Sequence, residues 1–402
     1  MLTDMEHFDL NAIGRDFIAD PHPTLHWLRA NSPVHRNADG SVYLTRHADC
    51  LKVYQSRDML SDKTEEFGKK FGQCPLHTHH TTSLIFNDPP YHTVVRKLIA
   101  GAFTPRKLAE MEKRIEGIVD RLLDQVEEKG ELDLIPDFGM ILPTEIISFM
   151  LGIPEDYRTM LRGFSLAILG ALDPVVPRDR IEAGNAAVTE FSEILTDLID
   201  HRRRNPDGAA QGEVLDALIF GEHDGRRLTQ EELVQNCIFL LNAGHETTTS
   251  LVGNSVAILL DNPDQHRMLL EDPDLITTAV EEFLRVQSPL QIGNRLAGED
   301  IALPSGTIPK GTYIHTSIGG ANRDPEVFVD PDRVDITRKP NKHIAFITGI
   351  HVCLGASLAR VEGRIALGRF VKRFPKLAAN GPAEIMPLAR FRGYSSLPVK
   401  VN

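Results

Sequence analysis

A cysteine stands between two glycines near the C-terminal end of this chain, within the stretch Phe346 to Arg360. Apolar residues recur at helical spacing from Leu358 to Phe370, so Cys353 is predicted to lie close to the N-terminus of a helix. Backbone N–H groups and the helix dipole favour a charged sulfur there. Gly349 and Gly355 allow the backbone to approach something flat and large. The pattern predicts a thiolate presented to a metal, although a lone cysteine among apolar residues is more often an inert buried side chain.

A second stretch with possible chemistry is the string from Ala243 to Thr248, where a glycine and four polar residues interrupt an apolar helical pattern. Ala243 and Thr247 are four residues apart and share one helix face. The string has two interpretations. It is either a kink, since threonine can bond back to the preceding turn, or a place where the acid Glu246 and the alcohol Thr247 transfer protons together.

Two charged pairs are less specific signals. His92 and Arg96 are four apart after a Pro-Pro break, and Glu282 and Arg285 are three apart on a second helical pattern. By themselves such pairs are typical of exposed helix faces and contribute little stability.

The segment from Glu65 to Asn87 loses periodicity and contains His77, His79 and His80. Histidines this close can bind a metal, but no carboxylate or cysteine is clearly arranged with them. We therefore favour a loop that lines the surface or a pocket over a metal site.

These residues must be positioned by a large, mainly helical body. With 402 residues and 42% hydrophobic content the chain can bury a substantial core. No linker or repeat divides it, which favours one domain over residues 1–402, with a partly β-rich region at about 1–62 and a mainly helical body at about 63–402. A capping box, Thr229 to Glu232, opens the helix that holds Glu246 and extends to about Leu260. The other main elements expected are a strand at 41–45, helices at 23–31, 106–128, 142–151, 154–171 and 180–204, and a loop at 172–177.

Composition indicates a reduced, soluble, cytoplasmic protein. The four cysteines, Cys50, Cys74, Cys237 and Cys353, are far apart and give no disulfide framework. The polar N-terminus has neither the apolar core of a signal peptide nor a membrane anchor. A formal charge of −12 argues against general binding to nucleic acid or anionic lipid.

The cysteine stretch closely resembles the cysteine loop of the cytochrome P450 family, Phe-Gly-x-Gly-x-His/Arg-x-Cys-x-Gly followed by an Ala-Arg helix. The one departure is Ile347, where the family usually has glycine; because a β-branched residue tolerates positive φ poorly, we expect Ile347 in a β conformation. The resemblance covers nearly the whole chain. It implies the family's mainly α, triangular-prism fold with a smaller β-rich side. It also implies one haem b (iron protoporphyrin IX), with Cys353 as axial ligand of the iron and Gly355 beside it.

The resemblance also implies roles for the other residues. Ala243 would leave room for dioxygen, Thr247 would hydrogen-bond its distal oxygen, and Glu246 would relay protons from solvent. Glu282 and Arg285 would join an arginine of Pro331-Asp332-Arg333 to hold the cysteine loop, without a part in catalysis. The residues that match the family's propionate ligands are His92, Arg96, Arg295 and His351.

The reaction implied is monooxygenation of a small organic substrate, with one oxygen atom of O2 entering the product and the other leaving as water. The sequence does not name the substrate, and a terpenoid, fatty acid, aromatic acid, steroid or macrolide precursor all remain possible. Asn242 could orient a hydroxyl or carbonyl. By resemblance, the pocket residues are Leu76, Ile85, Leu166, Phe239, Asn242, Leu290, Ile292 and Phe391.

Electrons must come from other proteins, because the chain contains no flavin, nicotinamide or iron-sulfur motif. The resemblance implies NAD(P)H as the source and a ferredoxin-type donor that docks on the thiolate side of a monomer. The helix after the cysteine is basic, and Arg96, Lys97 and Arg106 could add to its rim; we favour a merely solvated face for Arg369 and Lys376. The helix residues concerned are Arg360, Arg364, Arg369, Lys372, Arg373 and Lys376, against the single acid Glu362.

Two rival functions remain: a peroxide-driven hydroxylase or decarboxylase, and a haem protein that binds ligands without turnover. The pair Glu246 and Thr247 argues against the first, because such relatives tend to lack it. The thiolate motif and the same pair argue against the second.

Overall fold

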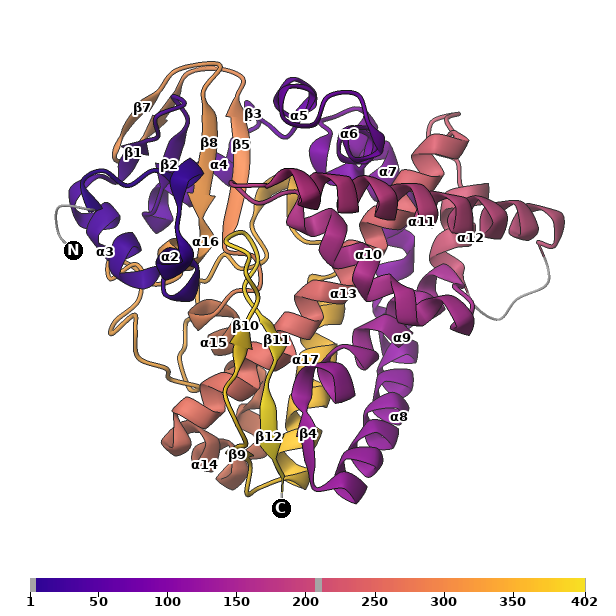
Figure 1. The fold of residues 1–402 in the computed structure, drawn as a ribbon, viewed down its shortest axis with the longest axis vertical. Coiled ribbons are helices and arrows are strands. Elements are labelled where there is room, and N and C mark those ends of the chain that lie inside the picture. The colour runs from indigo at the N-terminus through magenta and orange to yellow at the C-terminus, as the bar shows by residue number, and fades with distance from the viewer. Residues whose placement is uncertain (1–4, 207–211, 402) are drawn as a thin grey trace. The chain divides into compact units, whose positions relative to one another are not determined.

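The computed structural model describes residues 5–206 and 212–401. The chain forms two compact units, and each is described here by itself (Figure 1). The first comprises Met1–Leu60, Glu112–Met140 and Thr247–Asn402, and the second Ser61–Met111 and Ile141–Glu246. Two of the four unit boundaries fall within long helices, α8 (Pro105–Lys129) and α13 (Gln230–Asp261). A single domain over residues 1–402 stays a prediction.

Five short strands of the first unit form a mixed sheet in the order β1-β2-β8-β5-β3. β2 and β8 run parallel, and the other neighbours are antiparallel (Figure 1). The predicted strand at 41–45 is confirmed as β2, and the sheet places Arg295 of β5 opposite Ile314 of β8. The strands are β1 (Val34–Arg36), β2 (Val42–Leu44), β3 (Met59–Leu60), β5 (Ile292–Ala297) and β8 (Tyr313–Ser317).

Three smaller ladders complete the strands of this unit. β12 (Pro398–Lys400) lies between β4 (Glu131–Asp133) and β9 (Ala378–Ala379). The two remaining pairs are β6 (Ile301–Leu303) with β7 (Gly306–Ile308), and β10 (Glu384–Ile385) with β11 (Tyr394–Ser396).

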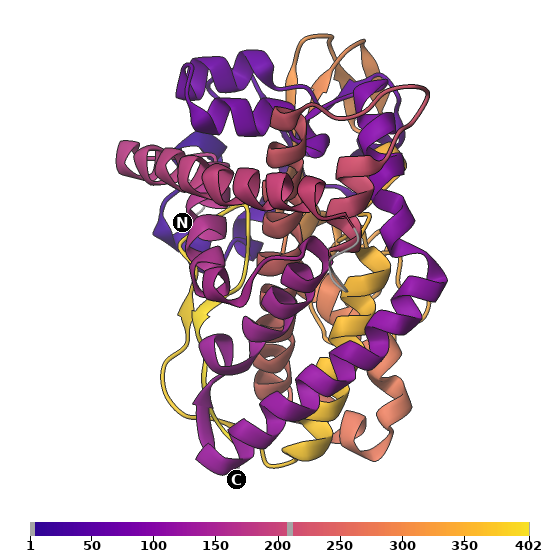
Figure 2. The same cartoon turned by 90° about the vertical axis from the view of Figure 1, so that its right-hand side faces the viewer.

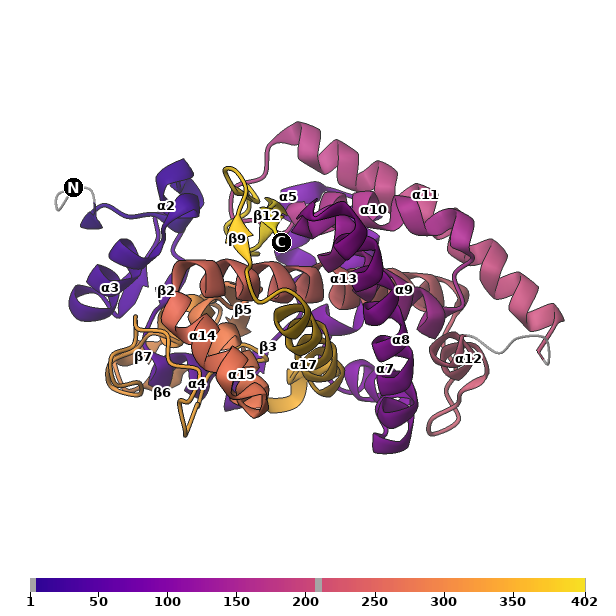
Figure 3. The same cartoon turned by 90° about the horizontal axis from the view of Figure 1, so that it is seen from below.

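Helices surround these strands in the first unit, and α17 is the one that follows the cysteine. Gly363 of α17 allows close packing on α13, since a Cβ at this glycine would lie 3.1 Å from the Leu251 side chain. Figure 2 shows α17 beside α8, and Figure 3 shows it near α15. The helices are η1 (Leu10–Ala12), α2 (Arg15–Ala19), α3 (His22–Asn31), α4 (His47–Gln55), the π-helical turn η4 (Ile135–Gly139), α14 (Pro263–Glu271), η6 (Pro273–Leu275), α15 (Ile276–Val286), α16 (Ile318–Ala321), η7 (Gly349–His351) and α17 (Ala356–Arg373).

The described residues of the second unit form helices joined by loops, with one isolated β-bridge between His223 and Arg226. α10 and α11 pack together through the stacked rings of Phe164 and Phe191, whose centroids are 5.3 Å apart. The predicted loop at 172–177 connects these helices. Besides the first turns of α8 and the first half of α13, the unit contains α5 (Thr64–Phe71), α6 (Pro75–Thr82), η2 (Leu84–Phe86), α7 (Tyr91–Ala100), η3 (Gly101–Phe103), α9 (Ile141–Leu151), η5 (Glu155–Tyr157), α10 (Arg158–Gly170), α11 (Arg178–Arg204) and α12 (Glu213–Phe220).

The long helices agree with the sequence to within a few residues. The capping box of α13 is formed: the backbone N–H of Thr229 donates to the Glu232 carboxylate, and the N–H of Glu232 donates to the Thr229 hydroxyl. The predicted helix at 154–171 is interrupted, because η5 precedes α10.

The interpretation of the histidine segment as a loop is wrong. α5, α6 and η2 cover most of it, and His77, His79 and His80 are all buried. The ring of His80 packs between Phe67, whose centroid is 5.2 Å away, and Phe86, at 5.3 Å. The helical periodicity of this segment is weak, so the sequence did not indicate these helices. Packing of the aromatic rings stabilises them in the folded protein.

Candidate functional site

The loop before α17 presents the thiol of Cys353 outward. The backbone N–H of Cys353 donates to the carbonyl of Phe346 over 3.0 Å, which closes the loop. Cys353 is exposed, whereas Cys50 and Cys237 are buried. Burial raises the pKa of the Cys237 thiol to about 12, so that thiol stays protonated and inert. Among the cysteines, Cys353 is the one that the fold presents as a ligand.

Gly349 fixes this loop against α4. Its φ is +76°, and a Cβ there would lie 2.0 Å from the carbonyl oxygen of Tyr54. No side chain fits that space, so the glycine is required for both its conformation and its size. By contrast, a Cβ at Gly355 would meet no protein atom within 4 Å, which leaves room beside the thiol.

The expected β conformation of Ile347 is wrong, because its φ is +50°. Its backbone N–H closes a turn onto the carbonyl of Ile344 over 2.8 Å, and its side chain packs against the apolar cluster around Val42 and Ile344. The left-handed conformation costs about 1–2 kcal/mol. Partial burial of the Ile347 side chain against this cluster offsets part of that strain.

Two further predicted residues lie in the same unit. Arg295 and His351 are both 7% exposed. The Arg295 guanidinium lies 5.2 Å from the ring centre of Tyr54, and its Nη1 donates to the carbonyl of Asn294 over 2.7 Å. These contacts hold a buried cation in place, and a cation held this way suits a carboxylate.

α13 runs as one helix from Gln230 to Asp261 and contains the string from Ala243 to Thr248. Gly244 allows close packing of α13 on α9, since a Cβ there would lie 3.1 Å from the Ile147 side chain. Ala243 is exposed on this largely buried helix, and Phe239 and Thr247, each four residues away, are half-buried. These three positions share one face, so the helix has an open stripe at the place where the sequence predicts room for dioxygen.

Glu246 and Asn242 are buried on α13 without hydrogen-bond partners among the described residues. One carboxylate oxygen of Glu246 lies 3.5 Å from Nδ1 of His245. Buried polar groups are usually hydrogen-bonded, so the Glu246 carboxylate and the Asn242 amide are both suited to bind a water molecule or a ligand group. Both lie in the second unit, as do His92, which is buried on α7, and Arg96, which is half-buried one turn later. The association of these residues with those of the first unit stays a prediction.

The buried carboxylate of Glu282 has a different third partner from the one expected. Arg285 donates two hydrogen bonds to it, each of 2.8 Å, and Arg338 approaches both oxygens at 3.2 Å. Arg333 is exposed and contributes only its carbonyl oxygen, which accepts from Arg285 over 3.1 Å. The assignment of the Arg333 side chain to this triad is therefore wrong. Arg338 was missed because it follows the family string by five residues, and only the fold of the loop brings it back.

Glu281, next to Glu282, holds the cysteine loop directly. Its oxygens accept from Arg360 over 2.6 and 2.8 Å, and His343 lies 3.0 Å away. Burial opposes ionisation, but the hydrogen bonds from Arg360 and His343 lower the pKa of Glu281 to about 2. The Arg360 guanidinium also lies 4.5 Å from the ring centre of Phe346. The only sequence signal for this contact was the charge of Glu281. That residue lies next to Glu282, which had already been paired with Arg285.

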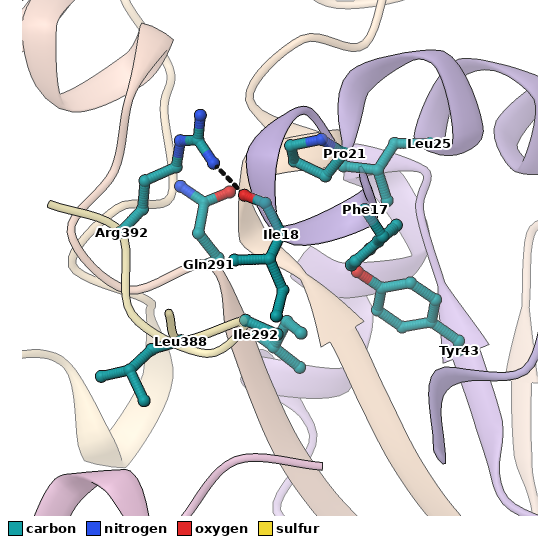
Figure 4. A pocket seen from close by; sticks show the side chains of 10 residues that line it. Phe17, Ile18, Pro21, Leu25, Tyr43, Gln291, Ile292, Leu388 and Arg392 are labelled. Carbon is teal, nitrogen blue, oxygen red and sulfur yellow. Dashed lines mark hydrogen bonds between the residues drawn. The ribbon is translucent and has the colours of Figure 1, made fainter. Parts of the chain in front are cut away.

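The predicted substrate-pocket residues are distributed over both units. In the first unit Leu290 and Phe391 pair as an isolated β-bridge, and Ile292 lines a small pocket with Phe17 and Leu388 (Figure 4). Arg392 also lines this pocket, and its Nη1 donates to the carbonyl of Ile18 over 2.6 Å.

In the second unit Leu76 is fully buried against Gly184 of α11, and Leu166 and Ile85 are half-buried. The grouping of these residues into one substrate pocket stays a prediction.

Comparison with known proteins identifies the family. The family model described as cytochrome P450 matches residues 52–390. The chain belongs to the cytochrome P450 family. Its relatives include the vitamin D(3) 25-hydroxylase of Pseudonocardia autotrophica, which is 38% identical over 407 residues and covers 100% of this chain and 98% of its own length.

Two solved P450 structures have the same fold. P450BioI in complex with hexadec-9Z-enoic acid ligated acyl carrier protein has a TM-score of 0.90 at 35% identity, covering 96% of this chain and 99% of its own. CYP109E1 from Bacillus megaterium in complex with testosterone has a TM-score of 0.86 at 28% identity, covering 97% and 100%. The predicted mainly helical P450 fold is confirmed, and the chain is a member of a family of haem-dependent monooxygenases that use O2.

The residues of the first unit fit a haem. The exposed thiol of Cys353 is chemically suited to bind iron, a Cβ at Gly355 would meet open space, and the buried Arg295 and His351 suit propionates. No group of three or more His, Cys, Asp or Glu side chains within residues 5–206 and 212–401 is arranged to hold a bare metal ion. In the same part of the chain, no helix is long and apolar enough for a membrane span.

Proposed function

We propose that this P450 oxidises a small, largely apolar organic substrate, with Cys353 as the axial thiolate of the haem iron. Arg295 and His351, with His92 and Arg96 of the second unit, bind the propionates. The observation that carries the proposal is the exposed thiol of Cys353 in a loop closed by its own N–H at the start of α17. When bound, the haem supplies the oxygen-activating chemistry, and the thiolate makes the iron electron-rich.

The protein's own contribution is proton delivery and exclusion of water. Ala243 keeps its face of α13 open, and the hydroxyl of Thr247 would hydrogen-bond dioxygen in the site. Glu246, buried and without a hydrogen-bond partner among the described residues, passes protons from water to that oxygen. This pair favours oxidation with O2 and NAD(P)H over a peroxide-driven reaction.

The electron donor in this proposal is a small acidic ferredoxin, reduced by a separate NAD(P)H-dependent flavoprotein. Fewer basic side chains of α17 are available to a partner than the sequence suggested. Arg360 is bound to Glu281, while Arg369 and Arg373 pair with acids of α8.

Two basic residues of α17 have no ion pair among the described residues: Arg364, which is half-buried, and Lys372, which is exposed. We assign the docking of the donor to these two residues.

The names and titles of the relatives support the proposed substrate class. Their names and titles mention vitamin D(3), a hexadecenoyl chain on acyl carrier protein, and testosterone. All three are extended apolar skeletons with few oxygens, and the predicted pocket residues of this chain are chiefly apolar.

The reduced, CO-bound absorption spectrum tests the proposal. Wild type should show a Soret band near 450 nm, the property for which the family is named. Cys353→Ala should lose it, whereas the control Cys74→Ala, at a half-buried cysteine, should keep it. A 450 nm band in Cys353→Ala would refute the ligand assignment. Turnover with NAD(P)H, a ferredoxin and its reductase separates an enzyme from a ligand-binding haem protein, and activity with peroxide alone would favour the peroxide-driven rival.

A further inference from the structure

Helices α2 and α3 form one wall of the small pocket that Ile292 lines (Figure 4). Phe17 and Ile18 come from α2 and Leu25 from α3, while Tyr43 of β2 and Ile292 of β5 belong to the sheet. All of these elements lie in the first unit. Release of the two helices would therefore expose the sheet residues of the pocket.

Two arginines tie these helices to the rest of the unit. Arg392 donates to the carbonyls of Ile18 and Ala19 at the end of α2, over 2.6 and 2.8 Å. Arg29 of α3 is buried and donates to the carbonyl of Gly320 of α16 over 2.8 Å. A guanidinium keeps its charge at every pH at which proteins fold, so these bonds do not respond to acid by themselves.

The imidazole of His26 lies between Arg29 and Asp332. Nη2 of Arg29 is 2.6 Å from Nδ1 of His26, and since a guanidinium can only donate, Nδ1 accepts. Nε2 of His26 lies 3.2 Å from the Asp332 carboxylate. That carboxylate favours a charged ring, but it is 55% exposed and is shared with Arg323, 3.1 Å away. The ring is therefore neutral in this arrangement, because a proton on Nδ1 would face the N–H of Arg29.

His22 is a second imidazole in the same group of charges. Its ring centre is 6.4 Å from that of His26. Burial and neighbouring arginines, first Arg323, lower the pKa of His22 to about 2. Burial also lowers the pKa of His26, although Asp332 opposes the shift. The charged groups that face the two rings are Arg29, Arg323, Arg392 and Asp332, and those arginines face Arg46, Arg285, Asp20 and Asp324 in turn. Both rings accept a proton more readily when α3 is released than when it is in place.

We propose that acid releases α2 and α3 from the sheet, because protonation of His26 and His22 breaks the contact with Arg29 and sets two new cations against the neighbouring arginines. Release uncovers the pocket beside Ile292. Free histidine titrates near pH 6.5, so the segment is closed above about this value and opens as the pH falls below it. Opening is favoured about tenfold per pH unit for each histidine that is charged only in the open state. This device goes beyond the proposed function and does not depend on it.

The single tryptophan of the chain, Trp27, reports on α3. It is half-buried and packs against the apolar cluster that includes Leu10 and Tyr43. Acrylamide quenching of its fluorescence in the haem-bound protein should rise about twofold or more between pH 7.5 and pH 5, and should reverse when the pH is restored. Far-UV circular dichroism should be largely retained. A rise that coincides with loss of most of the helical signal would be global unfolding, and would overturn the proposal.

Matched variants assign the response to the two histidines. Glutamine stays neutral and offers both an acceptor and a donor, so the double variant His22→Gln, His26→Gln should match wild type at pH 7.5 and lose the rise towards pH 5. The control His266→Gln changes a half-buried histidine of α14, whose pKa burial also lowers, and should keep the rise. No rise in wild type, a full rise in the double variant, or loss of the rise in the control would each overturn the inference.

Hydrogen exchange of the wild-type protein locates the opening without any substitution. After correction for the intrinsic effect of pH on exchange, protection should fall at pH 5 in peptides that cover residues 15–31 and stay unchanged in peptides from β6 and β7 of the same unit. Equal loss of protection in both sets would exclude a local release of α2 and α3.

Discussion

Arg338 binds Glu282 from a loop that lies far along the chain, with its Nε 3.2 Å from each carboxylate oxygen. The Glu282 side chain is fully buried, and that of Arg338 is 11% exposed. We predict that Arg338→Ala lowers the free energy of unfolding by about 2–3 kcal/mol, because it leaves a buried carboxylate with fewer donors. Arg333→Ala, at the position that the sequence favoured, should change it by about 0.5 kcal/mol or less. Urea denaturation measures both, and equal losses would restore Arg333 to the network.

Glu362 of α17 gives the protein a stability that depends on pH. Burial raises its pKa to about 8, although a hydrogen bond with Thr248 opposes the shift. The folded state therefore keeps a proton that the unfolded state releases above about pH 4.3. The stabilisation is complete below that value and is lost as the pH rises to about 8. Glu362→Gln should flatten this decline in unfolding free energy, as measured by urea titrations between pH 5 and 8.5.

Glu281 is the control for that experiment, because its pKa is shifted the other way, to about 2. Its contribution is present above the ordinary pKa of a glutamate and is lost as the pH falls towards 2. Glu281→Gln should change the acid side of the stability profile and leave the slope between pH 6 and 8 intact. If Glu362→Gln left that slope unchanged, Glu362 would not be the group responsible.

Reduction by ferredoxin tests the docking surface. Reversing Arg364 and Lys372 to glutamate should lower the second-order rate of reduction about tenfold or more at low salt, and should weaken its salt dependence. Substrate affinity should not change. The control reverses Arg36 of β1 and Lys310, two exposed cations elsewhere in the first unit. Stopped-flow kinetics equal to wild type in the α17 variant would place docking elsewhere.

Thr247→Ala tests oxygen activation. The variant should bind substrate and accept electrons normally, but release hydrogen peroxide in place of product, because the outer oxygen atom loses its hydrogen bond. The ratio of product to NAD(P)H consumed measures this. Glu246→Gln should instead slow turnover and change the solvent isotope effect, since it affects proton supply. Unchanged coupling in Thr247→Ala would remove that residue from the mechanism.

Sequence reasoning succeeded where a feature depends on neighbours in the chain. The capping box of α13, the placement of Cys353 before α17 and the shared face of Ala243 and Thr247 all follow from local spacing, and the structure has them. Sequence reasoning failed where contacts with residues far along the chain accompany the conformation. Ile347 has a positive φ while its side chain packs, partly buried, against a cluster that includes Val42 and Leu44 of β2, and no local preference reports that contact.

The charge of α17 is a second property that the sequence alone did not predict correctly. Its sequence counts Arg369 and Arg373 as part of a basic face, but Asp120 and Asp124 of α8 pair with them at 2.6 and 2.8 Å. The acids precede these arginines by about 250 residues, so no spacing rule relates them. A surface potential can be predicted only after helix pairing is known.

The contact of Gly349 with the backbone of Tyr54 has a consequence for the order of events during synthesis. Residue 54 leaves the ribosome long before the cysteine loop, so the loop forms against a partner that is already available. We therefore expect cofactor incorporation to be a late, largely post-translational step. Nascent chains stalled before residue 340 should retain no haem, even when α4 and its sheet have folded.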